Sequence, residues 1–391
     1  MQWPRDCPAG RSRAGRSESR GDTDHRGECR LALDGRTLLR ELLSAGGPAG
    51  GEAVATDLLR GAWADLSDEI GGDALGNLWA CRRARGARPA PTVVLAAHVD
   101  VIGLVVTRIL PGGFLRFAPV GGLDPRSILS REVVISGRRA VPAVVATVPP
   151  HLTTAEGRRR IPPVDELTLD TGLPDDELAW AVRPGDRGRL AGGPTELLGG
   201  RWCAAGLDNR AGLVALHETL LALHGRELPC DLYAVANVQE EVGLRGIGPV
   251  GRRLRPVAAV VVDVGFAAQP GAPAHLTASM GAGPVLAVGP ALHPAVDTLL
   301  QASAGRLAIP LQREVVAGNS STDAWALQVA AGGVAVGLLS IPLRSMHTPG
   351  ETVDYADVAH TGALLGAAVA AMDAGWASGL VTRLTGGEAG V

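Results

Sequence analysis

The sequence contains no lysine, so arginine supplies all 37 of its basic side chains. This absence excludes the phosphate-binding loop that ends in Gly-Lys-Ser/Thr. The arginines are scattered along the chain rather than gathered on one element, and the net charge at pH 7 is −3. Because nucleic-acid binders carry clustered positive charge, this distribution argues against a nucleic-acid partner.

Cysteine is scarce, and its spacing is uninformative for metal binding. The five cysteines never form a Cys-x-x-Cys pair: Cys7, Cys29, Cys81, Cys203 and Cys230. An odd number of widely spaced thiols indicates neither a disulfide framework nor a thiolate zinc site. This pattern favours a reducing compartment.

Long hydrophobic runs are absent as well. The most apolar stretches, Val257–Ala268 and Ala330–Leu343, are short or interrupted by glycine, and the alanine-rich C-terminal stretch carries Asp373. None is typical of a membrane span, and the first residues lack the apolar core of a signal peptide. We expect a cytoplasmic protein with no membrane partner.

Aromatic residues make up only 3 % of the chain, whereas alanine, valine, leucine and 53 glycines dominate. This composition favours an α/β fold over an aromatic-rich β-sandwich. With 391 residues and a hydrophobic content of 46 %, the chain can form one large or two medium domains with a proper core.

The hydrophobic pattern divides the chain into segments. Residues 1–35 are polar and aperiodic, and are predicted to be a disordered N-terminal extension. Residues 36–101 and 198–391 alternate helical and strand patterns, which predicts the two parts of a mixed-sheet α/β domain. Residues 102–197 carry short β-type runs between glycine and proline clusters, which predicts an inserted small β-barrel-like domain.

Periodicity predicts the individual elements. A first helix is expected from Arg36, with Leu38, Leu39, Leu42 and Leu43 on its apolar face, and it is ended by Gly46-Gly47-Pro48. Further helices are expected over Val54–Ala64, Arg210–His224, Ala291–Ala304 and Tyr355–Gly375. Strands are expected over Ala74–Arg82, Thr92–Ala97, Gly103–Ile109, Gly113–Pro119, Val133–Ile135, Ala143–Val148, Cys230–Val238, Val257–Val264 and Gly333–Ile341.

Two adjacent carboxylates, Glu240 and Glu241, follow the apolar run Cys230–Val238 and precede a glycine turn. Like charges side by side are unfavourable unless a cation compensates them or one of them holds a proton. A site with two metal ions meets both conditions, because one carboxylate can bind metal while its neighbour moves protons.

Two further candidates have a structural alternative of similar weight. In His98-Val99-Asp100, Asp100 could orient the imidazole of His98 for metal binding, or the pair could be a buried histidine satisfied by an acid. Asp208 precedes an apolar helix, so it could be a ligand near the strand ends or a helix N-cap.

Asp263 and His347 extend the set. Asp263 interrupts the apolar run Ala258–Val264, where an ionised acid without a partner is unfavourable, and His347 lies just beyond an apolar strand. Two histidines and three carboxylates without a thiolate suit Zn²⁺, Co²⁺ or Mn²⁺. The set therefore predicts a hydrolytic site with two divalent ions about 3.5–4 Å apart.

Five segments carry these candidates in a fixed order: His98-Val99-Asp100, Gly206-Leu207-Asp208-Asn209-Arg210, Gln239-Glu240-Glu241-Val242-Gly243-Leu244-Arg245-Gly246, Val262-Asp263-Val264-Gly265 and Ile341-Pro342-Leu343-Arg344-Ser345-Met346-His347-Thr348-Pro349. They resemble the M42 metallopeptidases, the glutamyl and tetrahedral (TET) aminopeptidases of the MH clan. Two further segments resemble motifs of that family's inserted domain: Gly121-Gly122-Leu123-Asp124-Pro125-Arg126 and Val148-Pro149-Pro150-His151-Leu152. The resemblance covers about residues 36–370 and implies a zinc-aminopeptidase-like catalytic domain, with the insert serving substrate access and oligomerisation.

The resemblance implies five metal ligands. Asp208 would bridge both ions, His98 and Asp263 would complete one site, and Glu241 and His347 would complete the other. The cofactors would be two divalent ions per subunit, Zn²⁺ or Co²⁺ first and Mn²⁺ as a further option.

The resemblance also assigns the remaining site residues. Glu240 would be the general base for a metal-activated water and then the acid for the leaving amine, and Asp100 would orient His98. Asp323 would lie in the substrate pocket, and Arg344, on the approach to His347, could either favour acidic substrate side chains there or be structural. Because the family holds the free α-amine of peptide substrates beside the metals, the implied activity is release of the N-terminal residue.

Family members assemble, often as dodecamers, so a homo-oligomer is expected. Other functions stay open: a metal-dependent amidohydrolase or deacylase of the same clan, an endoglucanase, or a binding protein that keeps the fold without activity. Glycosidases typically use an acid pair without metal, and the intact ligand set speaks against an inactive protein.

Overall fold

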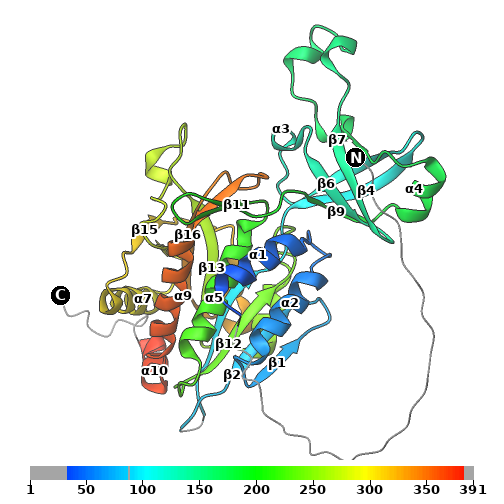
Figure 1. The fold of residues 1–391 in the computed structure, drawn as a ribbon. Coiled ribbons are helices and arrows are strands. Elements are labelled where there is room, and N and C mark those ends of the chain that lie inside the picture. The colour runs from blue at the N-terminus through cyan, green and yellow to red at the C-terminus, as the bar shows by residue number, and fades with distance from the viewer. Residues whose placement is uncertain (1–32, 87–88, 383–391) are drawn as a thin grey trace, which may run out of the picture. The chain divides into compact units, whose positions relative to one another are not determined.

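The computed structural model describes residues 33–86 and 89–382, so residues 1–32 of the predicted extension lie outside it. In this part of the chain, an 11-stranded mixed sheet is covered by helices, and a closed barrel is inserted between β3 and β10 (Figure 1). The predicted mixed α/β fold with an inserted barrel is confirmed.

The large sheet has the strand order β1-β2-β12-β3-β13-β16-β17-β11-β10, and β14 joins β16 and β15 beside this path. Strands β12, β3, β13 and β16 run parallel, so their carboxyl ends meet at one edge. The strands are β1 (Glu69–Gly72), β2 (Leu78–Arg82), β3 (Thr92–His98), β10 (Thr195–Leu197), β11 (Arg201–Ala204), β12 (Asp231–Asn237), β13 (Ala258–Phe266), β14 (Val285–Val288), β15 (Gln312–Val315), β16 (Ala335–Arg344) and β17 (Glu351–Asp354).

Helices cover both faces of this sheet, which is why its parallel strands are nearly continuous apolar runs. Along β3, Val93 and Leu95 belong to one buried cluster, whereas Val94 and Ala96 belong to another. Helix α5 packs on β3 and β13, and α8 packs on the same two strands and on β16. The helices of four or more residues are α1 (Gly35–Ala45), α2 (Ala53–Ala64), α3 (Pro125–Ile128), α4 (Asp175–Ala181), α5 (Leu207–Leu223), α6 (Ile247–Leu254), α7 (Pro294–Leu307), α8 (Asp323–Gln328), α9 (Tyr355–Val369) and α10 (Ala374–Thr382).

The barrel closes in the order β4-β5-β8-β7-β6-β9. It has a hydrophobic core of its own, which includes Leu104, Leu115 and Val133. Its strands are β4 (Gly103–Leu110), β5 (Phe114–Val120), β6 (Glu132–Ser136), β7 (Ala140–Ala146), β8 (Thr168–Asp170) and β9 (Arg187–Leu190). The next strand, β10, pairs with β11 in the large sheet, so the chain has returned to that sheet by Thr195.

The helix predicted over Tyr355–Gly375 is wrong as a single element, because it breaks into α9 and α10. The carboxylate of Asp373 accepts the N–H of Trp376 at 2.7 Å, so Asp373 starts a new helix instead of continuing the old one. No single helix in residues 33–86 and 89–382 is long and apolar enough to cross a membrane, and α9 and α10 pass that test only as a pair bent by 94°.

The strand predicted over Ala74–Arg82 starts only at Leu78. The Asp73 carboxylate accepts the N–H groups of Leu75 and Asn77 at 3.0 and 3.2 Å. These bonds hold the first residues of the predicted strand in a turn, because an aspartate side chain competes with ladder hydrogen bonds.

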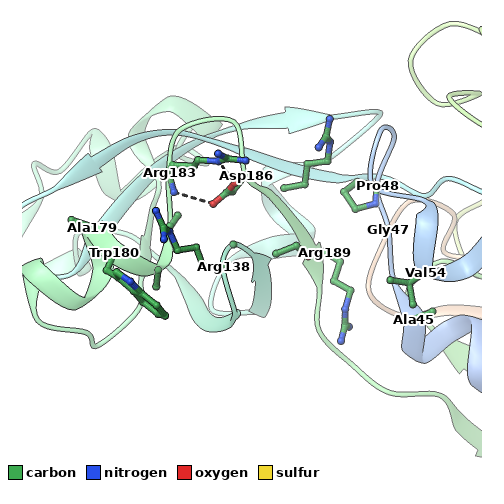
Figure 2. A pocket seen from close by; sticks show the side chains of 16 residues that line it. Ala45, Gly47, Pro48, Val54, Arg138, Ala179, Trp180, Arg183, Asp186 and Arg189 are labelled. Atoms are coloured by element: carbon green, nitrogen blue, oxygen red, sulfur yellow. Dashed lines mark hydrogen bonds and ion pairs between the residues drawn. The ribbon is translucent and has the colours of Figure 1, made fainter. Parts of the chain in front are cut away.

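A cavity of about 520 Å³ lies between the barrel and the segment that follows α1 (Figure 2). It is rich in arginine, but most of these side chains have partners. Arg183 lies 3.4 Å from the Asp186 carboxylate, Arg138 lies over the ring of Trp180, and Arg187 donates to a backbone carbonyl at 3.2 Å. None of the predicted site residues lines this cavity.

Candidate metal centre

The carboxyl ends of the parallel strands bring most of the predicted site residues to one edge of the sheet. His98 ends β3, Asp263 lies within β13, Glu240 and Glu241 follow β12, and His347 follows β16. Open α/β sheets gather ligands at this edge because the loops that leave parallel strands converge there.

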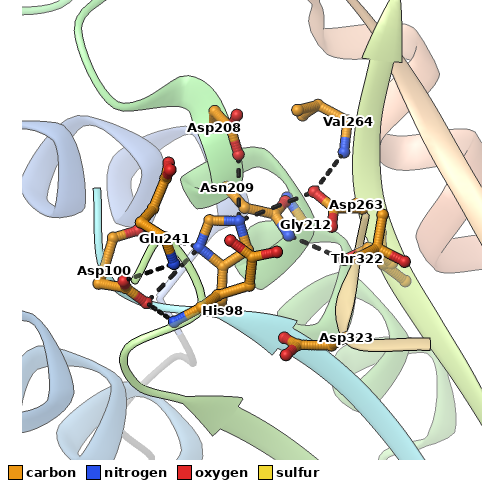
Figure 3. Close-up of polar contacts among 12 residues, drawn as sticks. His98, Asp100, Asp208, Asn209, Gly212, Glu241, Asp263, Val264, Thr322 and Asp323 are labelled. Carbon is orange, nitrogen blue, oxygen red and sulfur yellow. Dashed lines mark hydrogen bonds and ion pairs between the residues drawn. The ribbon is translucent and has the colours of Figure 1, made fainter. Parts of the chain in front are cut away.

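Asp208 reaches the same place from the first turn of α5. The N-cap of this helix is Gly206, so Asp208 is free for another role. Its Oδ1 lies 3.1 Å from Nε2 of His98, as Figure 3 shows, and its Oδ2 lies 3.3 Å from Nε2 of His347. One carboxylate therefore faces two imidazoles, one with each oxygen.

Two groups of possible ligands share Asp208. The first joins it to His98 and Asp263, the second to Glu241 and His347, and within each group the donor atoms lie within 4.8 Å of one another. The nitrogen-to-oxygen distances are 3.7 Å for His98–Asp263 and 3.4 Å for His347–Glu241. Zinc bonds of about 2.0–2.1 Å place the donor atoms of a tetrahedral site about 3.3–3.4 Å apart, so this spacing fits a divalent ion in each group.

The charges of the cluster point the same way. Burial acts to lower the pKa of His98, but hydrogen bonds with Asp208 and Asp263 raise it well above its usual value. Hydrogen bonds with Asp208 and Glu241 raise the pKa of His347 to about 11. The carboxylates thus favour positive charge at the imidazole nitrogens, and a divalent cation held between the same atoms would supply that charge.

Glu240 belongs to neither group of ligands. Burial is the main reason why its pKa is raised to about 9, and the negative charges of Asp263, Asp323 and Glu241 act in the same direction. A half-buried carboxylate that lines the cavity without belonging to a ligand group is suited to proton transfer.

The carboxylate of Asp100 positions the glutamate pair. Its two oxygens accept the backbone N–H groups of Glu240 at 2.9 Å and Glu241 at 3.1 Å (Figure 3). The backbone carbonyl of Asp100, rather than its carboxylate, lies 3.0 Å from Nδ1 of His98. This contact leaves Nε2 of His98 directed at Asp208.

Sequence reasoning missed two residues that support the site. Glu351 is buried and accepts the backbone N–H groups of Asp208 at 3.2 Å and His347 at 2.8 Å. Arg210 is also buried, and burial lowers its pKa to about 10 although the negative charge of Asp100 acts to raise it. Two sequence signals could have identified them: Glu351 is an acid at the start of a strand, and Arg210 is the one arginine of an apolar helix.

The structure places Asp323 and Arg344 outside the lining of the cavity of about 630 Å³ at this site. Asp323 is buried and accepts a hydrogen bond from Nδ2 of Asn237 at 2.5 Å, and burial raises its pKa to about 7. The Nε of Arg344 donates to the carbonyl of Ala268 at 2.9 Å.

Replacement of Gly122 by alanine is expected to weaken metal binding about 10- to 100-fold, the usual effect of disturbing a ligand's support. A Cβ at Gly122 would lie 2.6 Å from Nδ1 of His347, so the imidazole would have to move. Zinc titration against a chromogenic chelator measures the change. Gly61→Ala is the matched control, because nothing lies within 4 Å of its Cβ position. Equal zinc affinity in both variants would contradict the placement of His347.

Comparisons with known proteins show the family to which the chain belongs. A family model for M42 glutamyl aminopeptidases matches residues 76–364. A lysyl aminopeptidase from Pyrococcus furiosus is 35 % identical over 331 residues, which cover 83 % of this chain and 93 % of the relative.

Solved structures are similar over nearly their whole length. A TET aminopeptidase from a marine-sediment Thaumarchaeota archaeon has a TM-score of 0.83 and 25 % identity, and the match covers 88 % of this chain and 99 % of that one. The TET1 peptidase of Pyrococcus horikoshii, which can assemble into a tetrahedron or a large octahedral shell, has a TM-score of 0.76 and 27 % identity, with 86 % and 99 % covered. The chain therefore belongs to the M42 glutamyl aminopeptidase family and is a hydrolase of the aminopeptidase class.

Proposed function

We propose that this protein uses two divalent metal ions to release the N-terminal residue from peptides, with Glu240 as the general base. The observation that carries the proposal is the Asp208 carboxylate, whose two oxygens each face a different histidine within a separate group of ligands. A carboxylate in this position could be shared by two ions of a dinuclear site.

The residues divide the chemistry among them. His98, Asp208 and Asp263 would hold one ion, and Asp208, Glu241 and His347 the other. When bound, the ions lower the pKa of a water and polarise the scissile carbonyl.

Proton transfer is the task of Glu240, which takes a proton from the attacking water and delivers it to the leaving amine. Its backbone N–H donates a hydrogen bond to the Asp100 carboxylate at 2.9 Å, which fixes the position of its backbone. The backbone N–H of the neighbouring residue, Glu241, donates to the other oxygen of the same carboxylate, so Asp100 orients the backbone of both the proposed base and the proposed ligand.

Chelation and reconstitution test this proposal. The full chain is stripped with a chelator and assayed on an unblocked peptide before and after addition of Zn²⁺, Co²⁺ or Mn²⁺, with products identified by mass spectrometry. We expect activity to disappear on stripping, to return with metal, and to release residues from the N-terminus only. An N-acetylated copy of the peptide should remain intact.

The same assay separates the competing functions. Cleavage of the acetylated peptide but not of the free one would show that the protein is a deacylase of the same clan rather than an aminopeptidase. Reducing sugar released from carboxymethylcellulose would favour an endoglucanase. The endoglucanase outcome is not expected, because the carboxylates are arranged around two histidines rather than as an isolated acid pair. The deacylase outcome is not expected, because the family model and the Pyrococcus furiosus relative are both described as aminopeptidases.

We further propose that the chain forms a homo-oligomer, as the Pyrococcus horikoshii TET1 peptidase does. The barrel and the segment after β7 expose several large apolar side chains, a feature typical of subunit contacts: Val144, Val148, Leu152 and Ile161. Light scattering after gel filtration tests this proposal, and a single mass of about 40 kDa would contradict it. The cytoplasmic location stays a prediction.

A further inference from the structure

We propose that Glu314 makes the site selective for peptides whose first residue has a cationic side chain, lysine or arginine. This inference rests on the proposed aminopeptidase function and concerns the part of the cavity wall that holds no candidate metal ligand. The family description names glutamate and the Pyrococcus furiosus relative names lysine, so these names leave the sign of the preferred charge open.

Glu314 lies beside the candidate metal centre. It belongs to β15, which pairs with β14, and β14 pairs with β16. Its Oε1 accepts a hydrogen bond from Oγ of Ser340 at 3.0 Å, and Ser340 is the register partner of Asp263 on the adjacent strand. A substrate whose first carbonyl lies at the ligands can therefore reach Glu314 with its own side chain.

Glu314 gives the cavity a negative charge away from the candidate ligands, and no arginine in the described lining compensates this charge. Apart from the candidate ligands and Glu240, Glu314 is the one charged residue among the described residues that line it. Burial raises the pKa of the Glu314 carboxyl, whereas the hydrogen bond from Ser340 lowers it, and no arginine or histidine pairs with this carboxyl among the described residues that line the cavity. A cationic ligand group would supply the missing partner.

The remaining lining suits the stem of a long cationic side chain. It combines apolar and hydroxyl-bearing groups: Leu244, Phe266, Val316, Met346, Ser321 and Thr322. Lysine and arginine bury their methylene stems against apolar surface while their charged ends find a polar partner. Glu314 provides that partner within the same cavity.

Arg344 offers no competing attraction for acidic substrates. Its Nε is engaged by the carbonyl of Ala268 at 2.9 Å, and it is not among the residues that line the cavity. The charge that a substrate side chain meets is therefore negative. An N-terminal glutamate would add a like charge next to Glu314, which disfavours its binding.

Pairs of nearly isosteric substrates test the selectivity. We expect kcat/KM of the zinc-loaded enzyme to be at least about tenfold higher for arginyl-anilide than for citrullinyl-anilide, the effect of one partly buried charge pair. In Glu314→Gln this ratio should fall to about 1. Glu227→Gln, which removes an exposed carboxylate outside the cavity, is the matched control and should keep the wild-type ratio.

Calorimetric binding of free L-lysine and L-norleucine gives a readout that does not require turnover. Wild-type protein should bind lysine about tenfold more tightly than norleucine, and Glu314→Gln should bind both equally. If no anilide is cleaved but this binding difference is found, the proposed function fails and the role of Glu314 stands. A preference for norleucine or citrulline, or an unchanged ratio in Glu314→Gln, would overturn the inference.

Discussion

Replacement of Glu240 by glutamine is expected to lower kcat by about 10²- to 10⁴-fold while both metal ions stay bound, the range typical for loss of a general base. Glutamine has nearly the same shape as glutamate but cannot accept the proton of the attacking water. Since Glu240 lies in neither group of ligands, the substitution leaves every candidate metal ligand in place. The measurement is kcat on an unblocked peptide, combined with metal content by mass spectrometry after gel filtration.

The electrostatics of Glu240 explain why a carboxylate at this position can serve as a base near neutral pH. Burial and neighbouring carboxylates raise its pKa to about 9. Two dications held by the candidate ligands would act in the opposite direction and favour the ionised form that accepts a proton. The two influences on Glu240 therefore oppose each other, and a general base is most effective when its pKa lies near the operating pH.

Two comparisons make this prediction specific. Glu241→Gln should lose metal as well as turnover, because Glu241 lies in the group with Asp208 and His347. Glu227→Gln should behave as wild type, because Glu227 is exposed and lies outside the cavity. Full turnover in Glu240→Gln would show that Glu240 is not the general base. Loss of metal in this variant would instead identify Glu240 as a metal ligand.

The strand ends at the site could be predicted from the sequence because their patterns are strong. Mostly apolar runs predicted β3, β12, β13 and β16, and parallel strands place whatever follows them at a shared edge. Asp263 stood out because an acid inside such a run needs a partner, and the structure provides His98 at 3.7 Å. The short strands β14 and β15, four residues each, carry too little pattern to be recognised, so Glu314 was missed with them.

The direction of side chains also could not be predicted from the sequence. The spacing of His98 and Asp100 predicted a contact, and the contact exists, but it is the backbone carbonyl of Asp100 that approaches His98 most closely. The carboxylate instead holds the backbone of Glu240 and Glu241. Spacing fixes which residues are neighbours along a strand, whereas the choice of rotamer depends on donors contributed by a loop far away in sequence.

Replacement of Asp208 by alanine is expected to remove both metal ions and to lower kcat/KM by more than about 10³-fold, since no other residue belongs to both groups of ligands. The variant also removes the carboxylate that each histidine faces, at 3.1 Å for His98 and 3.3 Å for His347. Metal stoichiometry after gel filtration and kcat/KM on an unblocked peptide are the two measurements.

The single-site variants give this prediction its sharpest form. Asp263→Ala and Glu241→Ala each remove a ligand from one group only, so each should retain about one ion per chain, whereas Asp208→Ala should retain none. Asp208→Asn keeps a side-chain oxygen but loses the charge, and it should fall between wild type and Asp208→Ala in metal affinity. If Asp208→Ala kept one ion as tightly as Asp263→Ala does, the two groups would not share Asp208. The two ions would then bind at independent sites. If one carboxylate is shared by both ions, Asp208→Ala should lose both ions, whereas the variants of the unshared ligands should each lose one.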